Sequence, residues 1–523
     1  MLRRPPPVVP AVIAVVAVIL VGLLAYGFAL RLPLFLDDMV HFRWLEWHSF
    51  AGIWGSAWPL GYYRPLPFTT WKILVSVQRR YDPLALHALS LGLHLLNALL
   101  VLGLVATRAL KRGLWLGASS ALLFLLYPLS YQAVPWVGSL THPLVTALIL
   151  GSLLLFGVAE RKQSKYLAVG SVGLALLAPF AHETGVLVAP LLLLLLLTGE
   201  RPPPIDKALR QTLPYWLCAG FGLAVWLLAP KGAGRSGLLD LPSRWQNAVY
   251  FAQGLAYPVA PLAARLAAGT ARVSDLGAIV LVTFPVILAG SLLLWRAGRG
   301  RLVALALGWF GLALLPAWLV LGFWYVVDGP RLLYGASVGA ALFWALPVDL
   351  SWPGRWRSIV GAGLAALIVG GAALSGYRFI RGRVPLYEQM RLAVAQLLEA
   401  RGEPGEPLLC VNYPAWVAPI RSTFAVGHEG VTLVPPYTQV SDLLWVHTGE
   451  EYPVTSLVLP DLLQHWRYYY SCAGTTESSE SIQEKLRLAR RVIVTSYDQD
   501  DIAVHHAGGL EGEGRPRPDE YLA

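Results

Sequence analysis

Charged residues, cysteine and methionine are scarce in this sequence. Only 14% of its 523 residues are charged, whereas 56% are hydrophobic and three are cysteine. Typical soluble proteins carry about 25% charged residues, so this composition excludes an ordinary soluble protein. The three cysteines have no zinc-type or redox spacing, which excludes those two kinds of site.

Several common motifs are also missing. The sequence has no phosphate-binding Walker motif and no dinucleotide-binding glycine motif, so a soluble nucleotide cofactor has no visible site. The part after residue 377 shows no period of ~34 residues, which excludes tetratricopeptide repeats there. Cys410 and Cys472 both fall in this part, where an oxidising compartment could join them in a disulfide.

Long hydrophobic runs fill the first three quarters of the chain instead. A helix of ~20 apolar residues crosses the ~30 Å hydrocarbon layer of a bilayer. The first run is too long for the apolar part of a signal peptide and no small-residue cleavage site follows it, so we expect it to stay in the membrane. We predict an α-helical multi-pass membrane protein with about eleven spans, near residues 8–30, 84–106, 113–129, 139–158, 166–181, 184–198, 214–229, 276–294, 302–321, 331–348 and 357–376.

Lysine and arginine collect in alternate short loops, as they do on the cytoplasmic side of a cell membrane. This pattern predicts a cytoplasmic N-terminus and a C-terminal part on the extracytoplasmic side. The net charge of +10 then reflects topology and attraction to anionic lipid, and needs no nucleic-acid partner. The basic loops contain Arg3 and Arg4, Arg108, Lys111 and Arg112, Arg161 to Lys165, Arg201 to Arg210, Arg296 to Arg301, and Arg355 and Arg357.

We divide the chain into a transmembrane module, residues 1–376, and an extracytoplasmic α/β domain, residues 377–523. The module has two long outer loops, at 31–83 and 230–275, whose aromatic or amphipathic sequences suit short helices at the membrane surface. The domain alternates apolar runs with helix-like stretches, and its last dozen residues are expected to be disordered. The runs are Leu408–Tyr413, Val454–Leu459 and Arg491–Thr495, and the helix-like stretches are Leu386–Ala400 and Ser481–Arg490.

Asp37 and Asp38 stand just after the first span, on the predicted outer side. If the following segment is helical, Asp37, His41 and Trp44 share one face. Mutual repulsion and burial raise the pKa of one acid, which leaves one as a candidate base and the other as an orienting group or a metal ligand. The alternative is an ordinary solvated turn.

Other polar residues fall near the same predicted surface. Tyr63 and Arg64 suit contact with a phosphate or a carboxylate, or anchoring at the membrane interface. His182, Glu183, Arg331 and Tyr334 lie at outer ends of spans, where Arg331 could hold a lipid-linked phosphate or simply extend into the headgroups.

His87, His94 and Asn97 form a polar stripe on the second span. Such a stripe faces the bundle interior, because polar groups facing lipid cost free energy. The stripe either makes hydrogen bonds between helices or contributes a histidine to catalysis.

The ordered set of these motifs resembles the GT-C superfamily of membrane glycosyltransferases. It is most similar to protein O-mannosyltransferases and to the transmembrane, tetratricopeptide-containing O-mannosyltransferases, over roughly residues 30 to 380. The motifs are Asp37-Asp38, Tyr63-Arg64-Pro65-Leu66, His87-x6-His94-x2-Asn97, the stretch Pro128 to Gly138, His182-Glu183-Thr184-Gly185, and Arg331 to Tyr334. In the family motif that His182-Glu183 resembles, lysine usually precedes glutamate. Any role of that lysine would pass to His182 in this chain, and activity would then be more sensitive to pH.

The resemblance implies a sugar donor on a polyprenyl phosphate and an acid, Asp37 or Asp38, that deprotonates an acceptor hydroxyl on a protein, glycan or lipid. Attack on the anomeric carbon from the face opposite the phosphate would invert its configuration. Arg331 and Arg64 would stabilise the charge that develops on the phosphate. His41, Tyr63, His87, His94, His182, Glu183 and Tyr334 would support the pocket. A divalent metal is possible, and mannose is suggested by analogy alone.

Two other classes of protein stay open. A transporter or lipid flippase also needs polar residues within the membrane, although the inverted repeats typical of transporters are not visible. A non-enzymatic membrane scaffold would use the C-terminal domain for binding partners, and would not depend on Asp37 or Asp38.

Overall fold

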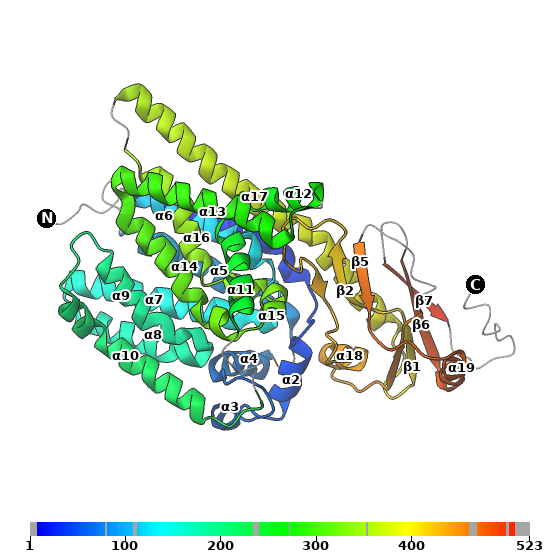
Figure 1. Ribbon diagram of the computed structural model, residues 1–523. Coiled ribbons are helices and arrows are strands. Elements are labelled where there is room, and N and C mark those ends of the chain that lie inside the picture. The colour runs from blue at the N-terminus through cyan, green and yellow to red at the C-terminus, as the bar shows by residue number, and fades with distance from the viewer. Residues whose placement is uncertain are drawn as a thin grey trace.

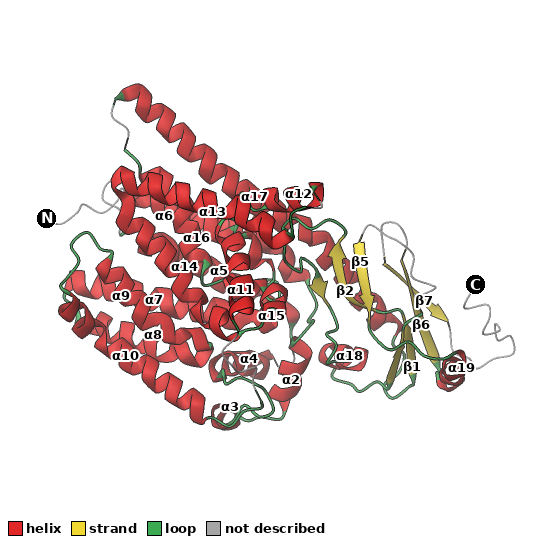
Figure 2. Ribbon diagram, viewed as in Figure 1, coloured by secondary structure: helices red, strands yellow, loops and turns green. Residues whose placement is uncertain are grey.

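The computed structural model describes residues 8–78, 81–107, 112–233, 240–270, 272–351, 354–459, 468–497 and 502–507. These residues are mostly helical, and the strands are confined to the C-terminal part, as Figure 2 shows by colour. To this extent the predicted fold class is confirmed. The last dozen residues and the basic residues Arg3, Arg4, Arg108 and Lys111 lie outside the described residues.

A helix covers each predicted apolar run. These helices pack into one bundle with a shared apolar core (Figure 1). They are α1 (Val8–Tyr26), α5 (Pro83–Ala106), α6 (Gly113–Leu125), α7 (Thr141–Lys162), α8 (Lys165–Ala181), α9 (Val188–Leu197), α10 (Ile205–Leu228), α13 (Asp275–Leu294), α14 (Gly300–Val320), α16 (Ser337–Ala345) and α17 (Arg355–Ala400).

Within the described residues, six helical stretches are long and apolar enough to cross a membrane. One of them, Asp275–Val320, contains Gly298 at φ +77°, a left-handed conformation that glycine adopts without steric cost. The chain turns at this residue from α13 into α14. The count of eleven spans stays a prediction, because the other apolar helices are shorter: Gly113–Leu125, Lys165–Ala181, Glu183–Leu197 and Ser337–Asp349.

Helix α17 differs from the sequence prediction of a span at 357–376 and a separate helix at 386–400. It is one helix of 46 residues with Pro385 inside it, and the expected start of the C-terminal domain at residue 377 falls in its middle. Gly376 lets α17 pass close to the end of α6, because a Cβ there would lie 1.9 Å from the carbonyl oxygen of Leu126. The helix therefore links the bundle to the sheet region.

Polar groups from separate loops meet at one end of the bundle, which we call the basic end. Arg299 forms an ion pair of 2.9 Å with Asp349, and Arg112 donates to the carbonyl of Val348 at 3.2 Å. Arg301 donates to the carbonyl of Glu200 at 2.6 Å. These arginines come from loops that the sequence assigns to the cytoplasmic side.

Short helices and the sheets lie at the opposite end, the sheet end (Figure 1). The two long loops are helical in part, as predicted. The short helices are α2 (Asp38–Glu46), α3 (Phe50–Gly55), α4 (Pro65–Gln78), α11 (Leu241–Leu255), α12 (Pro261–Gly269) and α15 (Phe323–Asp328). Single 3-10 turns connect several helices: η1 (Gly27–Arg31), η2 (Pro128–Tyr131), η3 (Val137–Leu140), η4 (Glu183–Leu187), η6 (Pro330–Leu333) and η7 (Leu346–Asp349).

The C-terminal part contains two small sheets. One has the order β4-β1-β6-β7, with β1 parallel to both β4 and β6, and the other has the order β3-β2-β5 and is antiparallel. Predicted strands at β1, β4 and β6 and the helix at α19 are confirmed. The elements are β1 (Leu408–Val411), β2 (Pro414–Pro419), β3 (Val431–Thr432), α18 (Val440–Thr448), β4 (Val454–Leu457), β5 (Tyr468–Cys472), α19 (Ser479–Leu488), β6 (Arg491–Tyr497) and β7 (Ile502–Ala507). No disulfide joins Cys410 and Cys472.

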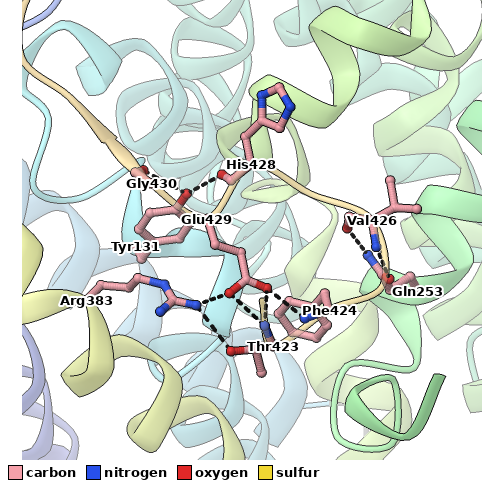
Figure 3. Close-up of polar contacts among 9 residues, drawn as sticks. All are labelled: Tyr131, Gln253, Arg383, Thr423, Phe424, Val426, His428, Glu429 and Gly430. Atoms are coloured by element: carbon pink, nitrogen blue, oxygen red, sulfur yellow. Dashed lines mark hydrogen bonds and ion pairs between the residues drawn. The ribbon is translucent and has the colours of Figure 1, made fainter. Parts of the chain in front are cut away.

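The loop between β2 and β3 attaches the sheets to the bundle (Figure 3). Glu429 forms a buried ion pair with Arg383 of α17 and accepts the backbone N–H of Phe424 at 2.6 Å. Gln253 of α11 donates to the carbonyl of Val426 at 2.6 Å. The hydroxyl of Tyr131 donates to the carbonyl of His428 at 2.8 Å. Three separate parts of the bundle therefore hold this loop.

Glu429→Ala should loosen the sheet region, because it leaves the charge of Arg383 buried without its partner. Loss of one partner of a buried pair costs about 3 to 5 kcal/mol. Thermal unfolding in detergent and limited proteolysis of the sheet region measure this effect. Glu388→Ala is the matched control, since the Glu388–Arg391 pair is about one-third exposed and its loss should cost less than about 1 kcal/mol. Equal stability of the two variants would contradict the anchoring role of Glu429.

Candidate active site between the bundle and the sheets

The two adjacent acids begin helix α2, and the residue before them has an unusual backbone. Leu36 has φ +61°, a conformation that costs a residue other than glycine ~1 to 2 kcal/mol. Its backbone N–H donates to the carbonyl of Leu433 at 2.9 Å, so the sheet region helps to hold this turn. Strained backbone of this kind is often found at functional sites.

Asp38 is fully buried and joins the turn before α2 to the turn at η3 through two hydrogen bonds. Its Oδ2 accepts the N–H of Phe35 at 3.1 Å, and its Oδ1 accepts the N–H of Gly138 at 2.6 Å. Burial raises the pKa of Asp38, while the two backbone N–H groups oppose that shift. Because the carboxyl group is fully buried and both of its oxygens join α2 to the turn at η3, it is not exposed to a substrate hydroxyl.

Asp37 is half-buried, and its Oδ1 accepts a hydrogen bond from the hydroxyl of Tyr437, in the C-terminal part of the chain. Among the described residues, no lysine, arginine or histidine lies within ion-pair distance of Asp37. The sequence could not distinguish the two acids. The geometry favours Asp37 as the candidate base and Asp38 as the residue that orients it.

His41, one turn further along α2, is buried among aromatic side chains. Its Nε2 lies 2.6 Å from the hydroxyl of Tyr62, and its ring stacks on Trp71. Burial lowers the pKa of His41 to about 4, the charges of Arg64 and Arg331 act in the same direction, and Asp37 opposes them. His41 is therefore neutral at pH 7, and the acid and both arginines lie close enough to affect it.

Arg64 is already neutralised by a carboxylate. Its Nη2 lies 2.8 Å from Glu183 Oε2, and its Nε donates to the same oxygen at 3.0 Å. The guanidinium lies 4.5 Å from the centre of the Tyr62 ring. Next to this pair, His182 accepts the N–H of Thr184 at 3.1 Å and lies 4.7 Å from the ring of His142.

Arg331 has polar and aromatic neighbours in place of a carboxylate. Its Nη1 donates to Gln132 Oε1 at 2.8 Å and its Nη2 to the hydroxyl of Tyr325 at 3.4 Å. The guanidinium lies 4.8 Å from the ring centre of Trp136. Within the described part of the chain no carboxylate lies within ion-pair distance of Arg331. A half-buried cation of this kind is suited to binding an anion.

Four residues expected to support the pocket make structural contacts elsewhere. Tyr63 donates to the carbonyl of Trp54 at 2.7 Å, so its neighbour Tyr62 faces the site in its place. His94 lies 2.8 Å from the hydroxyl of Tyr334, which links α5 to the chain before α16. His87 lies 3.2 Å from the carbonyl oxygen of Pro33, just before the acids. The polar stripe thus serves contacts between segments.

Several residues near the site are not among the candidates that the sequence motifs indicate: Tyr62, Gln132, Trp136, Gly138, His142, Tyr325 and Tyr437. Three of them belong to the stretch Pro128 to Gly138, in which the sequence pattern indicates no individual roles. Tyr437 follows Pro435 and Pro436 in a turn, and this sequence gives no signal of a contact with residue 37.

The donor groups do not make a metal site. Among the described residues, no group of three or more histidine, cysteine, aspartate or glutamate side chains is arranged to hold a metal ion. Both oxygens of Asp38 already accept backbone N–H groups, and Glu183 is paired with Arg64. These residues do not fit a divalent metal bound by the protein alone.

No protein-family model matches this chain, and a comparison with curated proteins finds no significant match. The functional assignment therefore depends on the geometry and on the sequence motifs.

Gly138→Ala should disturb the hydrogen bond between the Gly138 N–H and the Asp38 carboxyl group. A Cβ at this position would lie 2.7 Å from Trp136 Nε1 and 3.0 Å from Asp38 Oδ1, so the methyl group must displace one of them. Loss of a hydrogen bond by a buried carboxylate costs about 1 to 3 kcal/mol or more. We expect a lower melting temperature in detergent.

Gly173→Ala in α8 is the control. A Cβ there has no neighbour within 4 Å, and alanine favours a helix over glycine by about 1 kcal/mol. Melting of Gly138→Ala at or above the wild-type temperature would show that the Asp38–Gly138 bond does not hold the turn.

Proposed function

We propose that this protein is a GT-C-type membrane glycosyltransferase that transfers a sugar from a polyprenyl-phosphate-linked donor to an acceptor hydroxyl, with inversion. The observation that carries the proposal is the pairing of Asp37, a carboxylate with no cationic partner among the described residues, with Arg331, a cation with no carboxylate partner there. Arg331 lies 4.8 Å from the ring centre of Trp136, two residues before Gly138, and the N–H of Gly138 donates to Asp38, the neighbour of Asp37.

In the proposed reaction, the acceptor hydroxyl donates its proton to the carboxylate of Asp37. The hydroxyl oxygen forms a bond to the anomeric carbon from the face opposite the phosphate. The bond from that carbon to the phosphate oxygen breaks, and its electron pair leaves with the polyprenyl phosphate. The proton stays on Asp37 until solvent removes it.

Arg331 would stabilise the charge that develops on the departing phosphate. Such stabilisation is strong where the donor is held in place before reaction and water is excluded. Trp136 lies against the guanidinium of Arg331 and Gln132 hydrogen-bonds to it, which fixes its orientation. Arg64 is less suited to this role, because Glu183 already neutralises it.

We place the sheet end on the extracytoplasmic side of the cell membrane. The arginines of the basic end come from loops that fit the rule for cytoplasmic lysine and arginine, and the acids lie at the other end of the bundle. A lipid-linked donor could then present its phosphate and sugar at the membrane surface, next to Arg331.

The direct test is reconstitution in lipid vesicles with a panel of polyprenyl-phosphate sugars and hydroxyl acceptors. Asp37→Asn should lower kcat by about 100-fold or more, since a general base contributes 10² to 10⁴-fold. Glu451→Gln, a change at an exposed carboxylate that pairs with Arg43, should keep the wild-type rate.

Asp38→Asn should lower stability, because its amide would place a donor against one of two backbone N–H groups.

Turnover by Asp37→Asn at the wild-type rate would exclude Asp37 as the base. Movement of the lipid across the membrane with no sugar transfer would favour a flippase.

Arg331→Gln should weaken binding of polyprenyl phosphate by about 10- to 100-fold, or about 1.4 to 2.8 kcal/mol. Arg331→Lys should give an intermediate value, because it keeps the charge and loses the planar fork of donors. Equilibrium binding to the purified protein in nanodiscs measures both. Affinities equal to the wild type in both variants would remove Arg331 from the donor site.

A further inference from the structure

A short segment of the C-terminal part crosses directly over Asp37. We call residues 433–439, between β3 and α18, the strap. One end is fixed where the carbonyl of Leu433 accepts the N–H of Leu36 at 2.9 Å. The strap turns at Pro435, whose carbonyl accepts the N–H of Thr438 at 3.0 Å.

The other end of the strap is fixed by α18. This helix begins with a capping box formed by Gln439 and Asp442. It packs beside α2 (Figure 1), where the guanidinium of Arg43 lies 4.0 Å from the ring centre of Trp445. His447 of α18 also lies 3.0 Å from the carbonyl oxygen of Leu34. The strap is therefore attached to residues on both sides of the acid pair.

Tyr437 is the residue of the strap that reaches the acid. Its hydroxyl donates to Asp37 Oδ1, whereas the residue as a whole is 67% exposed. The ring is little buried by its neighbours, so moving it aside exposes little additional apolar surface. The contact is thus a single hydrogen bond to a carboxylate, made by a side chain that can leave.

We infer that the Tyr437 hydroxyl occupies the place of the acceptor hydroxyl when no acceptor is bound. An O–H group donated to the Asp37 carboxylate is the same hydrogen bond that an acceptor makes before it gives up its proton. While Tyr437 is in place, water has less access to the base, so hydrolysis of the donor is suppressed. The acceptor then enters from the side of the strap and displaces the phenol. This inference rests on the proposed function.

Tyr437→Phe tests the inference by kinetics. The variant keeps the ring and removes the hydroxyl that competes with the acceptor. We expect KM for the acceptor to fall about three- to tenfold, with kcat little changed, because the lost competitor is one hydrogen bond to a charged group. Release of free sugar from the donor without acceptor should rise.

Tyr469→Phe is the matched control, since Tyr469 is 57% exposed on β5 of the same region and should change neither value. Wild-type KM and wild-type hydrolysis in Tyr437→Phe would overturn the inference.

A measurement that needs no turnover separates this inference from the proposed function. A 3-fluorotyrosine placed at position 437 of the full chain, in nanodiscs, should give a ¹⁹F signal that shifts when Asp37 is changed to Asn. The same probe at position 469 should not shift.

An unchanged signal at 437 would overturn the inference whatever the activity. A shifted signal in a protein that turns over no lipid-linked sugar would refute the transferase function and the acceptor role with it, while the contact between the strap and Asp37 would stand.

Discussion

The carboxylate of Asp38, held between two backbone N–H groups, determines the geometry of the candidate site. It connects the turn before α2 to the turn at Gly138, two segments 100 residues apart in the sequence. A buried carboxylate with these hydrogen bonds is costly to disturb, because either N–H would be left without a partner. The preceding acid, Asp37, is thereby held in place, and its side chain is only half-buried.

The arginines around Asp37 differ in whether a carboxylate neutralises them. Arg64 is paired with Glu183, and Arg43 with Glu451, so neither is an open cation. Arg331 is held by an amide, a phenol and an indole ring, which orient a guanidinium without neutralising it. Under the proposed function, a cation without a carboxylate partner and a carboxylate without a cationic partner suit a reaction in which an anion leaves as a hydroxyl loses its proton.

The helices of the bundle could be predicted from the sequence because each apolar run is bounded by polar or basic residues. The acid pair could be located for the same reason, since it follows the first run directly. Strands β1, β4 and β6 were visible as apolar runs. The other strands and helix α18 were not: β3 has only two residues, β2 begins and ends with proline, β5 is a tyrosine-rich run, and α18 has polar residues among its apolar ones.

The detailed roles within the site depend on contacts between distant segments, which no local pattern encodes. Asp38 differs from Asp37 because of Gly138, and Tyr62 faces the site instead of Tyr63 because Tyr63 bonds to Trp54. The continuity of α17 could not be read from its sequence either, because Pro385 and the arginines near it favour an end to a span.

The central claim is that Asp37 and Arg331 face one pocket that receives a lipid-linked phosphate. The most direct measurement is a cryo-EM structure in nanodiscs with a non-hydrolysable polyprenyl-phosphate sugar. The account predicts the phosphate within hydrogen-bond distance of the Arg331 guanidinium and the anomeric carbon on the side of Asp37. A donor bound elsewhere in the bundle, with Arg331 still held by Gln132 and lipid density absent beside it, would contradict the account.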